Sequence, residues 1–251
     1  NIREASEQIN KALELSQELN YDKGRGEALI YKGVYERMVG CGELARKHLT
    51  TGIELSRRVN NKGLEGYGLL QFGSVMVSAG KKDSASLLFQ QSYSVLRDSL
   101  NPQMLSVLYR TWSKLFNLQS NSEMEKKYLL RSLAIRERLK DPILLLSIYA
   151  EVASYYNKNN QYDIAADYIK KAEAYIPLSE RTAEGNYELQ YVKATVLIKQ
   201  SKYAEALKTL NDLRKYAQSY TTPQSEVSLL IEVGSLFYDL GNYELSLVNY
   251  Y

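Results

Sequence analysis

The sequence is short of the residues that build disulfide frameworks and metal centres. Its 251 residues include one cysteine, Cys41, and one histidine, His48. A single cysteine excludes an internal disulfide and any zinc site built on several cysteines. A catalytic cysteine–histidine pair would need the two side chains adjacent and oriented. We instead interpret Cys41 as a turn residue and His48 as a helix-surface residue.

A strong excess of one charge and a long apolar run are also missing. The 32 basic and 29 acidic residues leave a formal net charge of +3, so electrostatic attraction to nucleic acid or an anionic membrane is weak. No apolar run approaches the roughly 20 residues that a membrane-spanning helix needs. We therefore expect no nucleic-acid partner and no membrane span in these residues. With 45% hydrophobic residues, the chain nevertheless has enough apolar surface for ordinary cores.

A repeat of 40 residues runs along the chain. Small residues recur in steps of 40, 40, 40, 41 and 40 at Gly33, Gly73, Ser113, Ala153, Ala194 and Gly234. A second, mostly small series follows twelve residues later at Ala45, Ala85, Glu125, Ala165, Ala206 and Ser246. Bulky residues come four positions further on, at Leu49, Phe89, Leu129, Ile169, Leu210 and Tyr250. Small side chains allow paired helices to approach closely, and bulky ones fill the neighbouring grooves.

Turn and capping residues keep the same period. Cap residues precede the first helix of each unit at Asn61, Asn101, Asp141, Thr182 and Thr222, and three of them are followed by proline. Residues suited to a left-handed turn lie midway through the units, at Gly40, Gly80, Ser120, Asn160, Ser201 and Gly241. The pattern predicts helix–turn–helix units at 22–60, 62–100, 102–140, 142–181, 183–221 and 223–251, with residues 1–20 as the second helix of an earlier unit.

The apolar spacing between these marks is helical. Leu69, Phe72, Gly73 and Met76 follow the i, i+3, i+4, i+7 pattern. A helical bundle with accidental periodicity would not keep caps, turns and small positions in one phase over six units. The apolar pattern is also still running at Tyr251, and no methionine begins the sequence. We therefore expect a fragment of a longer protein.

At these positions the chain resembles the tetratricopeptide repeat (TPR) family. The matching stretches are Trp112-Ser113-Phe116, Val152-Ala153-Tyr156, Val233-Gly234-Phe237, Ala165-Ile169-Ala172 and Ala85-Phe89-Ser92. The chain departs from the family at Glu125, where alanine is expected, at Glu36, where an aromatic residue is expected, and in its period, which is usually 34 residues. Helices of about 16 residues would absorb the difference. The resemblance implies one all-α, right-handed superhelical solenoid of stacked antiparallel hairpins over residues 1–251.

A narrower resemblance concerns the stretch that closes one unit. Residues 132–138 (Ser-Leu-Ala-Ile-Arg-Glu-Arg) are similar to the long repeats in the sensing regions of bacterial sensor kinases and transcriptional regulators. That similarity implies signal transduction, and it favours the periplasm slightly over the cytoplasm.

The sequence shows no catalytic, cofactor-binding or metal-binding motif. Gly24-Arg25-Gly26 and Gly66-Tyr67-Gly68 lack the preceding strand and further glycine of a phosphate-binding loop, and we interpret them as flexible linkers in unit connections. Carboxylates such as Glu123 and Glu125 lie near lysines in sequence, and we interpret them as solvated helix faces. We therefore predict a protein that is not an enzyme and binds no cofactor.

In stacked hairpins the first helix of each unit lines the concave face. The phase of the repeat therefore predicts which residues of that helix line a peptide-binding groove. The candidates are Tyr31, Arg37, Tyr67, Gln71, Arg110, Lys114, Asn117, Glu151, Asn157, Lys158, Tyr191 and Tyr238. The same phase includes Val34, Ser74, Ser154, Thr195, Ile198 and Ser235.

Within this set, Arg110 and Lys114 are four residues apart on one helix. With Asn117, and with Asn157 and Lys158 of the next unit, they predict a clamp for an acidic side chain or a terminal carboxylate. Neighbouring tyrosines would add apolar contact with a polar tip. The alternative is that these side chains only solvate an unused face, while ligands bind at a rim or on the convex side.

Two functions remain open at this stage. The first is the sensing or scaffolding region of a larger bacterial signalling or regulatory protein, in which a bound protein or peptide changes contacts with an output domain. The second is a free-standing intracellular adaptor or peptide receptor. Binding of nucleic acid is disfavoured by the balanced charge and by glutamates near the predicted groove, Glu27, Glu151 and Glu188.

Overall fold

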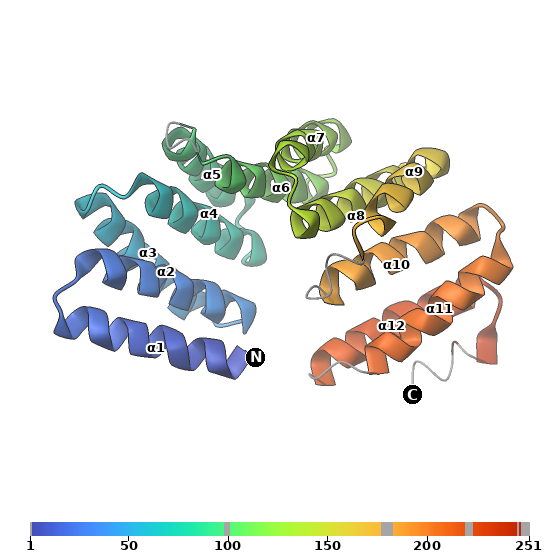
Figure 1. Cartoon of the computed structure of the whole chain (residues 1–251), viewed down its shortest axis with the longest axis horizontal. Coiled ribbons are helices and arrows are strands. Elements are labelled where there is room, and N and C mark those ends of the chain that lie inside the picture. The colour runs from blue at the N-terminus through green and yellow to red at the C-terminus, as the bar shows by residue number, and fades with distance from the viewer. Residues whose placement is uncertain (1, 98–100, 177–182, 219–222, 245, 247–251) are drawn as a thin grey trace. The chain divides into compact units, whose positions relative to one another are not determined.

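The computed structural model describes residues 2–97, 101–176, 183–218, 223–244 and 246 (Figure 1). These residues form an all-α fold, as the sequence predicts. Its helices in the first half are α1 Ile2–Glu18, α2 Asp22–Met38, α3 Gly42–Arg58, α4 Lys62–Ser78, α5 Lys82–Leu96, α6 Pro102–Leu118 and α7 Ser122–Leu139. Those that follow are α8 Pro142–Lys158, α9 Tyr162–Glu173, α10 Ala183–Lys199, α11 Tyr203–Gln218 and α12 Pro223–Asp239.

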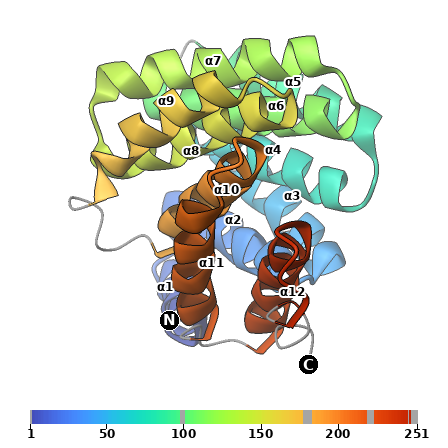
Figure 2. The same ribbon diagram turned by 90° about the vertical axis from the view of Figure 1, so that its right-hand side faces the viewer.

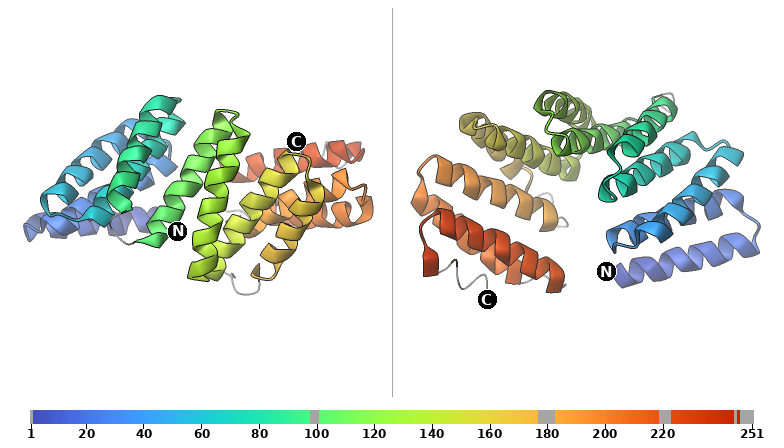
Figure 3. Two further views of the ribbon diagram at one scale, coloured as in Figure 1. Left: turned by 90° about the horizontal axis from the view of Figure 1, so that it is seen from above. Right: turned by 180° about the vertical axis from the view of Figure 1, so that it is seen from behind.

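The chain divides into two compact units, residues 1–135 and residues 136–251. In unit 1, α2 packs on α3 and α4 on α5, while α2 also contacts α4 and α4 contacts α6. The first helices of successive hairpins therefore form a layer of their own, which we call the first-helix layer (Figures 1 and 3). In unit 2 the corresponding layer consists of α8, α10 and α12, with α9 and α11 packed against it (Figure 2). That the two units form one continuous solenoid stays a prediction.

Left-handed residues close the first helix of each described hairpin, as predicted. The φ angles are 82° at Gly40, 73° at Gly80 and 78° at Gly241, and 56° at Ser120, 59° at Asn160 and 59° at Ser201. In the first hairpin, the N–H of Cys41 donates to the carbonyl of Glu36 (2.7 Å) and that of Gly40 to the carbonyl of Arg37 (3.2 Å). These bonds satisfy carbonyls that the end of the helix would otherwise leave unpaired.

The predicted caps lie where expected wherever the structure describes them. The Asn61 side chain accepts a hydrogen bond from the N–H of Leu64 (3.1 Å), and Asn101 accepts one from Met104 (3.1 Å). The Asp141 carboxylate accepts bonds from the two N–H groups at 143 and 144. Thr182 and Thr222 lie outside the described residues.

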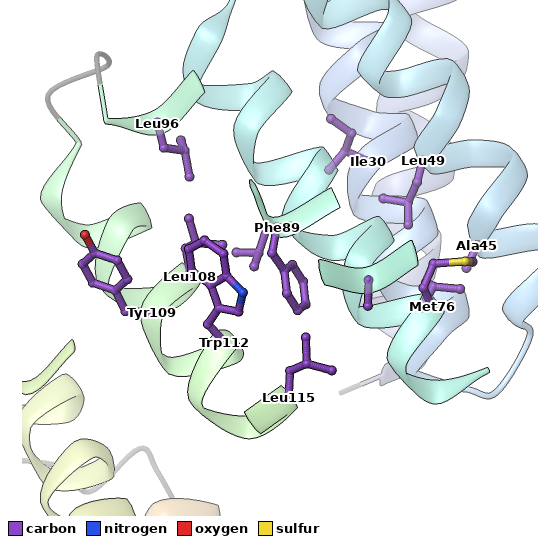
Figure 4. Packing of buried hydrophobic residues seen from close by; sticks show 13 residues of the cluster. Ile30, Ala45, Leu49, Met76, Phe89, Leu96, Leu108, Tyr109, Trp112 and Leu115 are labelled. Carbon is purple, nitrogen blue, oxygen red and sulfur yellow. The ribbon is translucent and has the colours of Figure 1, made fainter. Parts of the chain in front are cut away.

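The small repeat positions fit directly against the bulky ones. A Cβ atom placed on Gly33 would lie 2.6 Å from Cγ of Leu49, and one on Gly73 would meet the ring of Phe89. Leu49 and Phe89 are completely buried, and Figure 4 shows them in the same cluster as Trp112 and Leu115. The small residue therefore sets how closely the two helices of a hairpin approach.

The prediction that the glycine pairs are flexible linkers is wrong. Residues 24–26 belong to α2 and residues 66–68 to α4. A Cβ on Gly68 would lie 2.7 Å from Cγ1 of Ile53, and one on Gly66 would lie 2.5 Å from Leu96. In addition, the buried Ser92 hydroxyl donates to the Gly66 carbonyl (2.7 Å). These helical positions have glycine because side chains of neighbouring helices come too close for a larger residue.

The interpretation of carboxylates as solvated faces is also wrong for part of the set. Glu36, Glu65, Glu125 and Glu151 are all buried, with exposed fractions of 5–8%. Glu65 accepts hydrogen bonds from Nε of Arg57 (2.8 Å) and Nζ of Lys62 (3.2 Å). Partners at the end of α3 and the start of α4 therefore make the burial of Glu65 possible.

His48 likewise differs from the surface residue that its position suggests. It is half-buried, and its Nδ1 lies 2.7 Å from the Glu36 carboxylate. The pair links α3 to α2 at the repeat position where the family has an aromatic residue. Cys41 is exposed, as expected of a turn residue.

Candidate functional site

Four of the predicted groove residues gather in the first-helix layer of unit 1. Tyr31 and Arg37 lie on α2, and Tyr67 and Gln71 lie on α4. The ring centroids of Tyr31 and Tyr67 are 6.1 Å apart with the planes tilted by 52°, and Gln71 lies one helical turn after Tyr67 on α4. Tyr31 is 43% exposed and Gln71 only 8% exposed. We call this group the tyrosine–glutamine cluster.

The phenol of Tyr67 is held in its neutral form. Burial raises the pKa of Tyr67, and the neighbouring Tyr31 raises it further, whereas Arg37 and the hydrogen bond from Gln71 act in the opposite direction. The net change is upward from the ordinary value of about 10. At neutral pH the cluster therefore presents a phenolic O–H and one cationic side chain.

Two buried polar atoms of this cluster have no hydrogen-bond partner. One is Oε1 of Gln71 and the other is Nε of Arg37. Turning the Gln71 amide over would exchange its oxygen and nitrogen, but one polar end would still lack a partner. A buried polar atom without a partner costs about 1–3 kcal/mol. The residues of the cluster therefore leave part of its hydrogen-bonding capacity unused.

The remaining unit 1 candidates lie on α6. Arg110 is half-buried, and Lys114 and Asn117 are exposed. All three already interact with other groups of the molecule. Because Asn157 and Lys158 belong to unit 2, the clamp that combines them with α6 stays a prediction.

In unit 2 the structure joins two of the predicted residues directly. Nδ2 of Asn157 on α8 donates to Oγ1 of Thr195 on α10 (2.8 Å), and that hydroxyl donates to the Val192 carbonyl (2.7 Å). Glu151 on α8 is buried and Lys158 is exposed. This chain of bonds ties α8 to α10, so Asn157 has a structural task whether or not a ligand binds.

The two aromatic candidates of unit 2 lie on different helices. Tyr191 on α10 stacks on Tyr187, with centroids 6.4 Å apart. Tyr238 on α12 is 60% exposed and meets Tyr243 edge to face, with centroids 5.3 Å apart.

A cavity that the sequence did not predict lies at the turn end of the first hairpins of unit 1. Arg37 lines it together with Arg46 and Lys81, which lie on α3 and at the start of α5. The sequence contains a signal for this cavity, namely two cations that the next repeat lacks. The residues that correspond to Arg46 and Lys81 there are Ser86 and Asn121. This signal was overlooked because only first-helix positions were considered.

None of the described helices is long and apolar enough to cross a membrane. No group of three or more histidine, cysteine, aspartate or glutamate side chains within the described ranges could hold a metal ion.

Comparison with known proteins shows similarity of fold rather than of sequence. No protein-family model matches the chain, and no curated protein matches it. The apo form of the quorum sensor NprR from Bacillus thuringiensis superimposes with a TM-score of 0.73 at 17% identity, covering 98% of this chain and 68% of that one.

Two other solved structures have similar scores. Aspartyl phosphate phosphatase F from Bacillus subtilis gives a TM-score of 0.69 at 15% identity, covering 98% of this chain and 66% of that one. A signal-transduction ATPase with a tetratricopeptide repeat sensor, from Pyrococcus horikoshii, gives 0.72 at 16% identity, covering 97% of this chain and 39% of that one. The chain thus spans slightly under two thirds of the phosphatase and much less of the ATPase. In fold, it is a TPR-like helical-repeat protein that resembles these regulators and sensors.

Proposed function

We propose that the chain is a protein- or peptide-binding repeat module whose ligand lies on the first-helix layer of unit 1, over the tyrosine–glutamine cluster. The observation that carries this proposal is the buried amide of Gln71, one end of which has no hydrogen-bond partner. Keeping such a group in a packed layer costs stability, and binding of a ligand would offset that cost.

A peptide backbone supplies the donor that Gln71 lacks. Because Oε1 of Gln71 is enclosed, the amide turns outward when a peptide N–H donates to it. Tyr31, which is 43% exposed, adds broad apolar contact with a polar tip, a composition common at binding interfaces. The neutral phenol of Tyr67 offers a further donor.

We further propose that this module is the sensing or scaffolding part of a larger bacterial signalling or regulatory protein, and that it does not itself catalyse a reaction. The similarity in fold to a quorum sensor and to a TPR sensor supports this role. Binding would change how the module contacts a further domain.

Selection from a phage-displayed library of random linear peptides tests the binding face. The full 251-residue chain is immobilised, and enriched peptides are synthesised and titrated against the wild type and Gln71→Leu. We expect the substitution to weaken binding by about tenfold, the effect of one well-placed hydrogen bond in a desolvated site. The Gln71→Leu chain should fold with a free energy of unfolding within about 1 kcal/mol of the wild type, because an apolar side chain of similar size replaces a poorly satisfied polar one.

Gln90→Leu is the matched control, since Gln90 is exposed on α5 in the other layer. It should leave peptide affinity unchanged. Peptides that bind Gln71→Leu as tightly as the wild type would place the ligand elsewhere on the molecule. A library that yields no enriched peptide would count against peptide binding as a whole.

A further inference from the structure

A cavity of about 330 Å³ lies at the turn end of the first two hairpins of unit 1. The C-terminal ends of α2 and α4 form one side, and the start of α3 and the residue before α5 form the other. Met76 supplies an apolar wall, and Figure 4 shows it beside Ala45 of α3. The cavity is separate from the exposed ring of Tyr31, because Arg37 is the only predicted groove residue among the lining residues described.

Positive charge is in excess around this cavity. Its lining includes Arg37, Arg46 and Lys81 but only one carboxylate, that of Glu43. Glu43 accepts hydrogen bonds from both Nε (3.1 Å) and Nη2 (2.8 Å) of Arg46, so these two charges offset each other. Within the described part of the chain, neither Arg37 nor Lys81 forms an ion pair. Two cations therefore face the cavity without a counter-charge.

Hydrogen-bond donors without acceptors lie at the same place. Nε of Arg37 is buried and has no acceptor. The 17-residue helix α3 begins at Gly42, and its capping residue Cys41 makes no side-chain hydrogen bond. The N–H of Glu43 therefore lacks an acceptor in the first turn, and the positive end of the helix dipole lies at the cavity.

The packing of the hairpins does not require these cations. One repeat further on, the residues that correspond to Arg37, Arg46 and Lys81 are Val77, Ser86 and Asn121. The next repeat thus has no positive charge at any of these three positions. The repeat itself therefore does not require a cation at these three positions.

We propose that this cavity binds an oxyanion, a carboxylate or phosphate group, between Arg37, Lys81 and the start of α3. Arg37 and Lys81 line the cavity and supply its positive charge, and the N–H groups of Glu43 and Leu44 at the start of α3 complete the donor set. Charge-assisted hydrogen bonds of this kind are the strong ones in proteins. The site goes beyond the proposed peptide face, and inorganic ions alone test it.

Titration of the full chain with sodium phosphate, and separately with sodium acetate, provides the test. Ionic strength is held constant with sodium chloride, and backbone amide shifts are followed by NMR. We expect saturable shifts at Glu43 and Leu44, together with a rise in the melting temperature that grows with ligand concentration. Arg37→Gln and Lys81→Gln should each weaken binding by about tenfold.

Lys47→Gln is the control for bulk charge, because Lys47 is exposed next to Arg46 but does not line the cavity. It should bind as tightly as the wild type, and so should Gln71→Leu, which separates this site from the peptide face. Saturable shifts with phosphate alone would identify the bound group as a phosphate. Saturable shifts with acetate as well would show that the site also binds carboxylates. The proposal is overturned if neither ion gives saturable shifts, or if Lys47→Gln weakens binding as much as Lys81→Gln.

Discussion

In the first two hairpins of unit 1 the small repeat positions are the glycines Gly33 and Gly73, whereas in the first two hairpins of unit 2 they are Ala153 and Ala194. The bulky partners differ far less: Leu49 and Phe89 in unit 1, and Ile169 and Leu210 in unit 2, are all buried. In unit 1 an added Cβ would collide with its partner. In unit 2 the Cβ is present and buried. The comparison indicates that the repeat requires a small residue at this position, and that the first two hairpins of unit 1 leave no room for the methyl group of alanine.

Replacing a glycine of unit 1 by alanine should lower the free energy of unfolding more than the other substitutions considered below. Gly73→Ala places a Cβ against the ring of Phe89, which is completely buried and cannot move aside without disturbing the cluster in Figure 4. Overpacking of this kind costs about 1–3 kcal/mol of unfolding free energy. Urea denaturation followed by circular dichroism measures the change, and hydrogen exchange should localise it to α4 and α5.

Gly63→Ala in the same helix is the control, and its expected effect on the free energy of unfolding has the opposite sign. The nearest atom to a Cβ at Gly63 is Oδ1 of Asn61, at 3.8 Å, so the added methyl makes only an ordinary van der Waals contact. Alanine should then stabilise the helix by up to about 1 kcal/mol. If both substitutions stabilised the protein, close approach would not be the reason for glycine at position 73.

The reverse exchange in unit 2 should have a smaller effect. Ala153→Gly removes a buried methyl, which is worth about 0.8 kcal/mol, and places glycine inside α8, which costs about 1 kcal/mol. We expect the free energy of unfolding to fall by about 1–2 kcal/mol. Ala134→Gly on the exposed side of α7 carries only the helix-propensity cost. Equal losses at the two sites would mean that Ala153 contributes nothing by packing.

Features that depend on local residue order could be predicted from the sequence. The caps at Asn61, Asn101 and Asp141 and the left-handed residues such as Ser120 and Asn160 were all found. They were accessible because capping and turn chemistry act over three or four residues and recur with the repeat. Further left-handed residues at Asn20, Asn60 and Lys140 were missed because the connections between units were not searched for turn residues.

Features that depend on a partner from another helix could not be predicted in the same way. The burial of Glu65 depends on Arg57 of the preceding helix, and the helical state of Gly66 depends on Leu96 of the following one. The four-residue cluster around Tyr67 contains positions that the repeat phase selected. That phase did not show which of them would lack hydrogen-bond partners, because hydrogen-bond satisfaction is a property of the packed layer.

The smallest expected effect concerns a tyrosine of unit 2. The Tyr149 hydroxyl donates to Oε1 of Glu137 (3.1 Å), and the side chain is 7% exposed. Burial raises the pKa of Tyr149 to about 12, and the hydrogen bond to Glu137, its charge and the nearby Tyr175 and Tyr168 act in the same direction. In unit 1, Tyr67 and Tyr109 also have raised pKa values, again chiefly through burial.

The sign of the resulting pH dependence follows from linkage. A tyrosine in the unfolded chain ionises near pH 10, whereas folded Tyr149 stays protonated to higher pH. Its contribution to stability is therefore fully present below about pH 10 and is lost as the pH rises toward about 12. Tyr149→Phe cannot ionise, so its stability should fall less steeply over that interval. Urea denaturation at a series of pH values measures the slope, and Tyr203→Phe, at an exposed tyrosine, should keep the wild-type slope. If the Tyr149→Phe and wild-type slopes were the same, Tyr149 would ionise alike in the folded and unfolded chains, and its burial against Glu137 would have no energetic effect.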